Sequence, residues 1–261
     1  MPHRHPLATL IAASLATAAT FLTLTACGGS EEDSKNDKGS KTSDSAPAKG
    51  QEEPQKEKRA TAAQLSLAGS EVAGYSIRKP STDYVFAKSR DNIKLSKPVC
   101  APLGHAMSQF PVGTPAPQDD QVRVHIAEAK KFSGVFTYIT IATYAPGKAQ
   151  AALSDMKKAV GACKDGFTAK GDKQSNPYDS IAPETPGTPD TVPTKTADDS
   201  LAFRATAKYQ GHTHTFHTQA TRHGDTLAIY FSTDGSAFTE SRPGDGKLFP
   251  AVVKAQEKKL G

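Results

Sequence analysis

The sequence predicts an α+β domain in which helices pack against an antiparallel β-sheet. Segments in which apolar and polar residues alternate come in neighbouring groups separated by short turns, which is typical of antiparallel hairpins. Other segments place apolar residues three and four apart, which indicates amphipathic helices. Along residues 61–261 the strands come in groups instead of alternating strictly with helices, so a parallel sheet is not expected.

Four sets of elements are expected before residue 142: a helix at 61–69, a strand at 74–78, a helix at 98–109, and strands at 122–126 and 135–141. The first helix places Leu65 and Leu67 on one side. Pro98 suits the first turn of the second helix. Strand 122–126 alternates apolar with polar residues, whereas strand 135–141 is β-branched and aromatic on both faces, so we place the latter centrally.

The second half is expected to contain a helix at 146–163, strands at 201–209, 213–223 and 227–231, and a helix at 248–260. Both helices carry apolar residues at helical spacing. Strand 201–209 has the clearest alternation in the chain, and tight turns at 210–211 and 224–225 join the last three strands. Residues 171–198 are rich in Pro, Gly, Asp and Thr, and they predict a long loop containing at most a short strand at 178–182.

Residues 1–26 have the composition of a bacterial lipoprotein signal peptide. A short basic region precedes an apolar stretch from Leu7 to Leu24, which is marginal in length for a membrane span. The stretch ends in Leu24-Thr25-Ala26-Cys27, which resembles a lipobox, so we expect cleavage before Cys27 and a diacylglyceryl group on its sulfur. Two acyl chains anchor a protein stably. A transmembrane anchor or an ordinary signal peptide is the alternative.

Residues 27–60 are expected to be a disordered polar linker, because no Leu, Ile, Val, Met or aromatic residue occurs between Cys27 and Ala60. The domains are therefore a signal at 1–26, a linker at 27–60 that carries the lipid, and one α+β domain at 61–261. We expect this domain on the outer face of the cytoplasmic membrane.

The net charge is modest and bears on the class of partner. The chain has a formal net charge of +5, all of which falls in residues 61–261. This is not the dense basic stripe of a nucleic-acid-binding protein, and secretion also removes nucleic acid as a partner. The partners expected are the membrane, through the lipid, and a small polar ligand, wall polymer or a surface protein.

Two cysteines remain after Cys27 is assigned to the lipid. Cys100 and Cys163 form an even pair in an oxidising compartment, so we expect one disulfide, with two unrelated free thiols as the alternative. Both fall on predicted helices, which the disulfide would join. Closing a loop of this size stabilises a fold by about 4 kcal/mol.

The spacing of three segments resembles that of a known group of proteins. Lys97-Pro98-Val99-Cys100-Ala101-Pro102-Leu103, the helix ending in Ala162-Cys163, and Arg222-His223-Gly224-Asp225-Thr226 are similar to small actinobacterial lipoproteins and to the extracytoplasmic sensor domain of PknH-type kinases. The resemblance covers roughly residues 61–261. It implies an antiparallel sheet covered by helices and a ligand-sensing role. PknH-type domains usually carry two disulfides, whereas this chain can form one.

Two local patterns suggest chemistry. His212 and His214 share one face of a strand and could ligate a metal, but a third ligand is missing locally, so no metal site is predicted. Ser154 and Lys157 match the S-x-x-K pattern of penicillin-recognising enzymes, but the accompanying S-D-N and K-T-G elements are missing. No catalytic residue and no cofactor are predicted.

The sequence therefore favours a lipid-anchored, non-catalytic binding or sensor module, with an enzyme that has a dispersed active site as the alternative. The predicted sheet places one candidate ligand patch on its outer face, made of Arg204, Lys208, His217 and Gln219. A solvated outer face explains the same residues. The 171–198 loop borders this patch and is a candidate lid.

Overall fold

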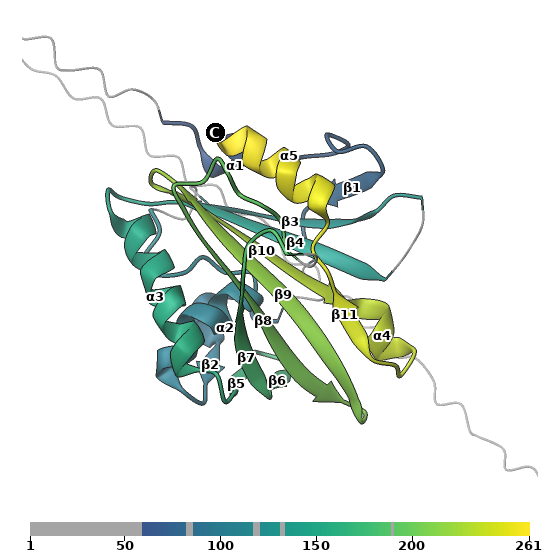
Figure 1. Cartoon of the computed structure of the whole chain (residues 1–261). Coiled ribbons are helices and arrows are strands. Elements are labelled where there is room, and N and C mark those ends of the chain that lie inside the picture. The colour runs from purple at the N-terminus through teal and green to yellow at the C-terminus, as the bar shows by residue number, and fades with distance from the viewer. Residues whose placement is uncertain (1–58, 82–85, 117–120, 131–133, 189–190) are drawn as a thin grey trace, which may run out of the picture. The chain divides into compact units, whose positions relative to one another are not determined.

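The frame of the domain is an antiparallel sheet with strand order β1-β3-β4-β10-β9-β8-β7, as Figure 1 shows. The computed structural model describes residues 59–81, 86–116, 121–130, 134–188 and 191–261. In sheet order the strands are β1 (Tyr75–Arg78), β3 (Gln121–Glu128), β4 (Val135–Thr143), β10 (Thr226–Asp234), β9 (His212–His223), β8 (Asp199–Tyr209) and β7 (Ser180–Glu184).

Hairpins determine this order. β3 and β4 are consecutive and antiparallel, and β8, β9 and β10 form a meander. The turn at Gln210 and Gly211 has positive φ at both residues, as a two-residue hairpin of the primed type requires. β4 and β10 then pair along nine residues, so β4 lies inside the sheet as its apolar faces predict. Where β10 separates from β9, the short strand β11 (Gly244–Gly246) pairs in parallel with β9.

A second, three-stranded sheet lies beside the first and was not predicted. It contains β2 (Lys94–Leu95), β5 (Phe167–Lys170) and β6 (Ser175–Tyr178) in the order β2-β5-β6. β6 and β7 lie in the segment 171–198, where a loop with at most a short strand at 178–182 was expected, so that expectation is corrected to two strands. The proline content concealed these strands, but Pro183 is tolerated because β7 is an edge strand.

Helices cover both faces of the main sheet. The first face packs against α2 (Ala101–Met107) and α3 (Lys148–Ala162) around Leu103, Leu153 and Phe203. The second face packs against α1 (Ala62–Leu65) and α5 (Pro250–Leu260) around Ile139, Val252 and Val253. In Figure 1, α2 and α3 lie on one side of the strands and α5 on the other. We call these the first and second faces below.

The expected helices are present but two have different limits. The helix expected at 98–109 is a 3-10 turn, η3 (Pro98–Cys100), followed by α2. The helix expected at 61–69 stops at Leu65, and Ser66 is already extended. The reason is tertiary: the amide of buried Gln256 on α5 accepts a hydrogen bond from the Leu67 N–H (2.9 Å) and donates one to the Leu65 carbonyl (2.7 Å).

The disulfide between Cys100 and Cys163 is confirmed, and it joins η3 to the C-terminal end of α3. Both cysteines are fully buried in the core of the first face. The predicted signal, Cys27 and nearly all of the linker lie outside the described residues. In the part that the structure describes, no helix is long and apolar enough to cross a membrane.

Candidate ligand-binding cleft

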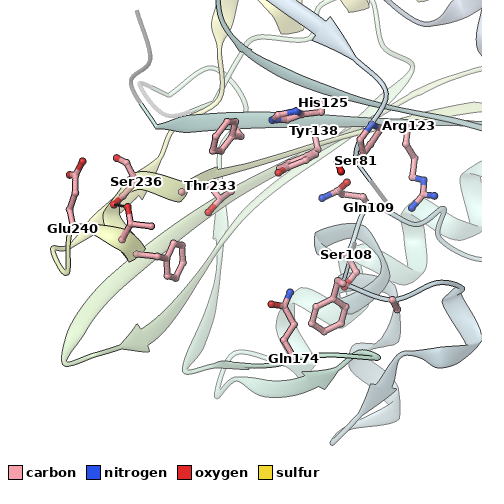
Figure 2. A pocket seen from close by; sticks show the side chains of 17 residues that line it. Ser81, Ser108, Gln109, Arg123, His125, Tyr138, Gln174, Thr233, Ser236 and Glu240 are labelled. Atoms are coloured by element: carbon pink, nitrogen blue, oxygen red, sulfur yellow. Dashed lines mark hydrogen bonds between the residues drawn. The ribbon is translucent and has the colours of Figure 1, made fainter. Parts of the chain in front are cut away.

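A cleft of about 860 Å³ opens on the first face, beyond the part of the sheet that α3 covers. Its floor comes from β3, β4 and β10, and one wall comes from α4 (Gly235–Thr239), which directly follows β10. The other wall comes from residues around Phe86, the end of α2, and Gln174 between β5 and β6. Figure 2 shows Arg123 at one end of the cleft, Glu240 at the other, and His125 and Tyr138 between them.

Strand alternation builds the floor. On β3, Val124 and Ile126 point into the core of the second face, so Arg123 and His125 point to the first face. On β4, Phe136 and Tyr138 share that face. We call His125, Phe136 and Tyr138 the aromatic floor.

The rings of the aromatic floor contact one another. His125 and Tyr138 are direct cross-strand partners, and their rings stack with centroids 5.0 Å apart. The Phe136 ring lies 4.9 Å from His125. The floor therefore offers a cluster of packed aromatic rings to a ligand, and cross-strand packing fixes its geometry before any ligand arrives.

The α4 wall is held by a buried carboxylate. Asp234 caps the helix by accepting a hydrogen bond from the Ala237 N–H (3.2 Å), and Arg242 donates to the same carboxylate (2.8 Å). Burial alone would raise the pKa of Asp234, but the hydrogen bonds from Arg242, Ser236 and Ala237 lower it overall. Phe238 on this helix stacks on His214 at 4.1 Å, which fixes its ring at the cleft.

The opposite wall is held by Asp172. Its carboxylate accepts hydrogen bonds from the Lys88 N–H (2.6 Å) and from the Asn92 amide (2.8 Å), and its own N–H donates to the Phe86 carbonyl (3.1 Å). Gly171 touches the Phe86 backbone so closely that a Cβ atom there would collide with it. These contacts tie the β5–β6 turn to the segment that carries Phe86.

His125 is an uncharged polar group in the floor. Burial, and secondarily the charge of Arg78, lower its pKa, so the ring is neutral at neutral pH. Its Nε2 atom is buried and has no hydrogen-bond partner among the described residues. Burial also raises the pKa of Tyr138, whose phenol therefore keeps its proton. The floor thus combines apolar ring faces with neutral hydrogen-bonding groups.

The four residues of the predicted patch share one face of β8 and β9, with Arg204 directly opposite His217, but they do not form one exposed patch. Arg204 and Lys208 are exposed as expected, but His217 and Gln219 are buried, so the prediction of one exposed patch is wrong for these two. Gln219 is fully enclosed, and its amide accepts from the Val192 N–H (2.9 Å) and donates to the Val192 carbonyl (2.8 Å). His217 lies between Glu184 (3.0 Å) and Asp245 (2.8 Å).

The physical reason is that part of the second face is covered. β11 and the segment around Val192 cover the strands at His217 and Gln219, and α5 packs on another part of this face, whereas Arg204 and Lys208 stay exposed. The lid expected at 171–198 is corrected for the same reason. Its described part pairs with both sheets or packs over Gln219, and Gln174 is the one described residue of this segment that lines the cleft.

The other two patterns have structural explanations. His214 is buried against Phe238, and the described residues contain no group of three or more side chains arranged to hold a metal. On α3, Lys157 pairs with Asp199 at 2.6 Å.

The sequence did contain a signal for the cleft. Strand 135–141 is aromatic and β-branched on both faces, which predicts that other elements or a ligand cover both of its faces.

Comparison with known proteins gives weak structural likenesses. No family model and no curated protein matches the chain. The fold is similar to the extracellular domain of PknH from Mycobacterium tuberculosis, with a TM-score of 0.41 and 7% identity over 71% of this chain and 80% of that one. It is also similar to an uncharacterized Mycobacterium smegmatis protein, the Rv0999 ortholog, with a TM-score of 0.30 and 9% identity over 72% and 86% of the two chains. The function must therefore be argued from the residues of the cleft.

Proposed function

We propose that this chain is a lipid-anchored extracytoplasmic binding module that holds a small ligand with an apolar, ring-like body in the cleft on the first face. The aromatic floor carries the proposal, because it presents rings to an open space of about 860 Å³. That volume falls in the range of roughly 300–1,000 Å³ that is typical of ligand sites, as does the mixture of ring faces with a few polar groups.

Binding fits the cleft better than catalysis does. A nucleophilic hydroxyl needs a base within hydrogen-bond distance. The Nε2 atom of His125 contacts no donor or acceptor in the described part of the chain. The Ser236 hydroxyl donates to the structural carboxylate of Asp234 (3.0 Å) and accepts from Arg242 (2.6 Å), so the α4 wall also occupies this hydroxyl.

The lipid anchor is supported by the lipobox-like Leu24-Thr25-Ala26-Cys27 and by the buried disulfide, which suits an oxidising compartment. Cys27→Ala removes the acceptor sulfur, so we expect the variant to leave the membrane fraction. Fractionation and detergent partitioning of the two proteins measure this. A variant that partitions as the wild type does would contradict lipid anchoring.

The cleft is tested by filling it. Thr233 is half-buried in the floor, and Thr233→Trp places an indole in the open space. The neutral fluorophore N-phenyl-1-naphthylamine is titrated into the full chain carrying Cys27→Ala, which keeps acyl chains out of the assay. We expect affinity at least about tenfold weaker in the filled variant, a loss of roughly 1.4 kcal/mol.

The matched control is Thr213→Trp, which places the same side chain at an exposed position of β9 on the opposite face. It should bind the fluorophore as the parent does. Equal binding by the filled variant and the control would contradict the proposal. Any signal common to all variants reports binding elsewhere, such as to the apolar N-terminal stretch, and is subtracted.

A further inference from the structure

Arg123 is a half-buried cation that has no ionic partner among the described residues. Its side chain starts on β3, and its guanidinium lies over the Phe110 ring at 5.0 Å. No carboxylate of the described residues lies within 4.0 Å of it, and no hydrogen bond to it is found within this part of the chain. A guanidinium with five donors rarely stays this isolated when partly desolvated, because removing a charge from water costs free energy that only a counter-charge repays.

Arg123 stands where two cavities meet. It lines the end of the cleft, and it also lines a second cavity of about 540 Å³ formed by residues 88–91, 110–111, 114–116 and 121–123. The charged side chains of the second cavity are Lys88, Arg90, Arg123 and Asp91. Among the described lining residues, three cations against one carboxylate make this end of the cleft positive.

The two ends of the cleft are of opposite charge. Arg123 lies at one end and Glu240 at the other, as Figure 2 shows. Arg242 and Glu240 pair at 2.6 Å, which partly offsets the acidic end, whereas within the described part of the chain Arg123 contacts the Phe110 ring and no carboxylate. A cation–π contact stabilises a guanidinium less than an ion pair with two hydrogen bonds does at the same place. An elongated ligand would therefore bind in one direction, with its negative end at Arg123.

We propose that the ligand of the cleft is a small amphipathic anion, whose apolar body lies on the aromatic floor and whose carboxylate, sulfonate or phosphate pairs with Arg123. Lys88 and Arg90 add long-range attraction from the second cavity. The inference rests on the proposed function and adds the charge and direction of the ligand to it. The planar fork of Arg123 suits a two-oxygen anion, and its guanidinium already lies over the Phe110 ring.

A pair of probes with one aromatic body separates the charge from the apolar contact. 1-Anilinonaphthalene-8-sulfonate carries a sulfonate that N-phenyl-1-naphthylamine lacks. Both are titrated by fluorescence into the full chain with Cys27→Ala. We expect the sulfonate to bind about tenfold or more tightly than the neutral probe, as one charge-assisted pair predicts.

Arg123→Met should abolish that advantage and leave the neutral probe unchanged, because methionine keeps an apolar stem beside Phe110. Arg123→Lys should restore part of it, since a single ammonium keeps the charge without the fork. Lys208→Gln, which removes one exposed cation from β8 outside the cleft, is the control and should change neither probe. Thermal unfolding of each variant shows that it is folded.

The possible failures are distinguishable. The proposal of an anionic ligand is overturned if the neutral probe binds in the cleft but the sulfonate probe binds no more tightly. It is also overturned if Arg123→Met leaves the tighter binding of the sulfonate probe intact. In both cases the proposed function stands. If Thr233→Trp affects neither probe, both proposals are overturned. Should Arg123→Met not fold, raising salt from about 0.05 to about 0.5 M on the parent chain replaces it. Salt should weaken the sulfonate alone, and equal effects on both probes would overturn the inference.

Discussion

His217 is buried and contacts residues of two other strands, although it was predicted to lie on the surface. Its side chain is 3% exposed, and its two ring nitrogens contact Glu184 on β7 and Asp245 on β11. Arg204 lies 3.8 Å from the Glu184 carboxylate and Lys247 lies 3.6 Å from that of Asp245. A protonated ring donates to both carboxylates at once, so this one residue of β9 fastens β7 and β11.

His217 makes stability depend on pH in a predictable direction. Burial opposes the charged ring, but hydrogen bonds and charges from Glu184 and Asp245 prevail and raise its pKa. Its contribution is therefore fully present below the unfolded-state pKa of about 6.5 and is lost as pH rises through the folded-state pKa. The stability advantage of the wild type over His217→Gln should be larger at pH 6 than at pH 9.

Urea denaturation of both proteins at the two pH values measures this difference, because titrations common to both proteins cancel. An advantage that is equal at pH 6 and pH 9, or larger at pH 9, would rule out a charged His217 between its carboxylates.

At the scale of elements, one buried carboxylate of α5 adds a polar attachment to the apolar packing of this helix on the second face. Glu257 accepts hydrogen bonds from Tyr230 (2.6 Å), Thr221 (2.8 Å) and His223 (3.0 Å), which lie on β9 and β10. Burial alone would raise the pKa of Glu257, but these donors lower it overall. Its stabilising contribution is therefore present above the unfolded-state pKa of about 4.3 and is lost as pH falls through the folded-state pKa.

Glu257→Ala should destabilise the fold by roughly 3 kcal/mol, because it leaves three polar side chains without their shared acceptor. Glu71→Ala is the control. The Glu71 side chain is 44% exposed and pairs with Lys259 on α5. Losing this carboxylate should therefore lower the free energy of unfolding by less than about 1 kcal/mol. Chemical denaturation at neutral pH gives both values, and equal costs would show that the buried network does not hold α5.

Sequence patterns over neighbouring residues predicted the strands and helices that are determined mainly by those neighbouring residues. The alternation of strand 201–209 and the turn at Gln210 and Gly211 gave the meander, and helical spacing gave α3 and α5. The short strands β2, β5, β6 and β11 were missed, and the helix at α1 was predicted too long, because tertiary partners determine these elements. The Leu67 N–H bonds to Gln256 and not within a helix, and β11 pairs with β9 only where β10 departs.

At the scale of the whole molecule, the sheet has two covered faces, and this arrangement decides where a site can lie. The alternation of apolar and polar residues correctly assigned the odd- and even-numbered residues of β8 and β9 to opposite faces of the sheet. It could not show that α5 and β11 would cover the polar side, since either face of a sheet can receive a helix. The second face is thus closed at His217 and Gln219. The cleft remains on the first face, where it lies over β3 and β4, beyond the part of the sheet that α3 covers.

The disulfide joins the two helical elements of the first face across 63 residues of sequence. Replacing both Cys100 and Cys163 with alanine should cost about 4 kcal/mol through the lost restraint on the unfolded chain. For a domain of this size that lowers the melting temperature by roughly 10 °C. Calorimetry of the variant, and of the wild type with reductant, measures it. A melting temperature within 2 °C of the oxidised protein would contradict this role.

The most direct test of the account is to find where N-phenyl-1-naphthylamine binds, using intermolecular nuclear Overhauser effects in the full chain with Cys27→Ala. We expect contacts from the probe protons to the rings of Phe136 and Tyr138, and their loss in Thr233→Trp. Contacts to Phe249 and Val252 on the second face, with none to the aromatic floor, would show that the ligand site lies elsewhere and would contradict the central claim.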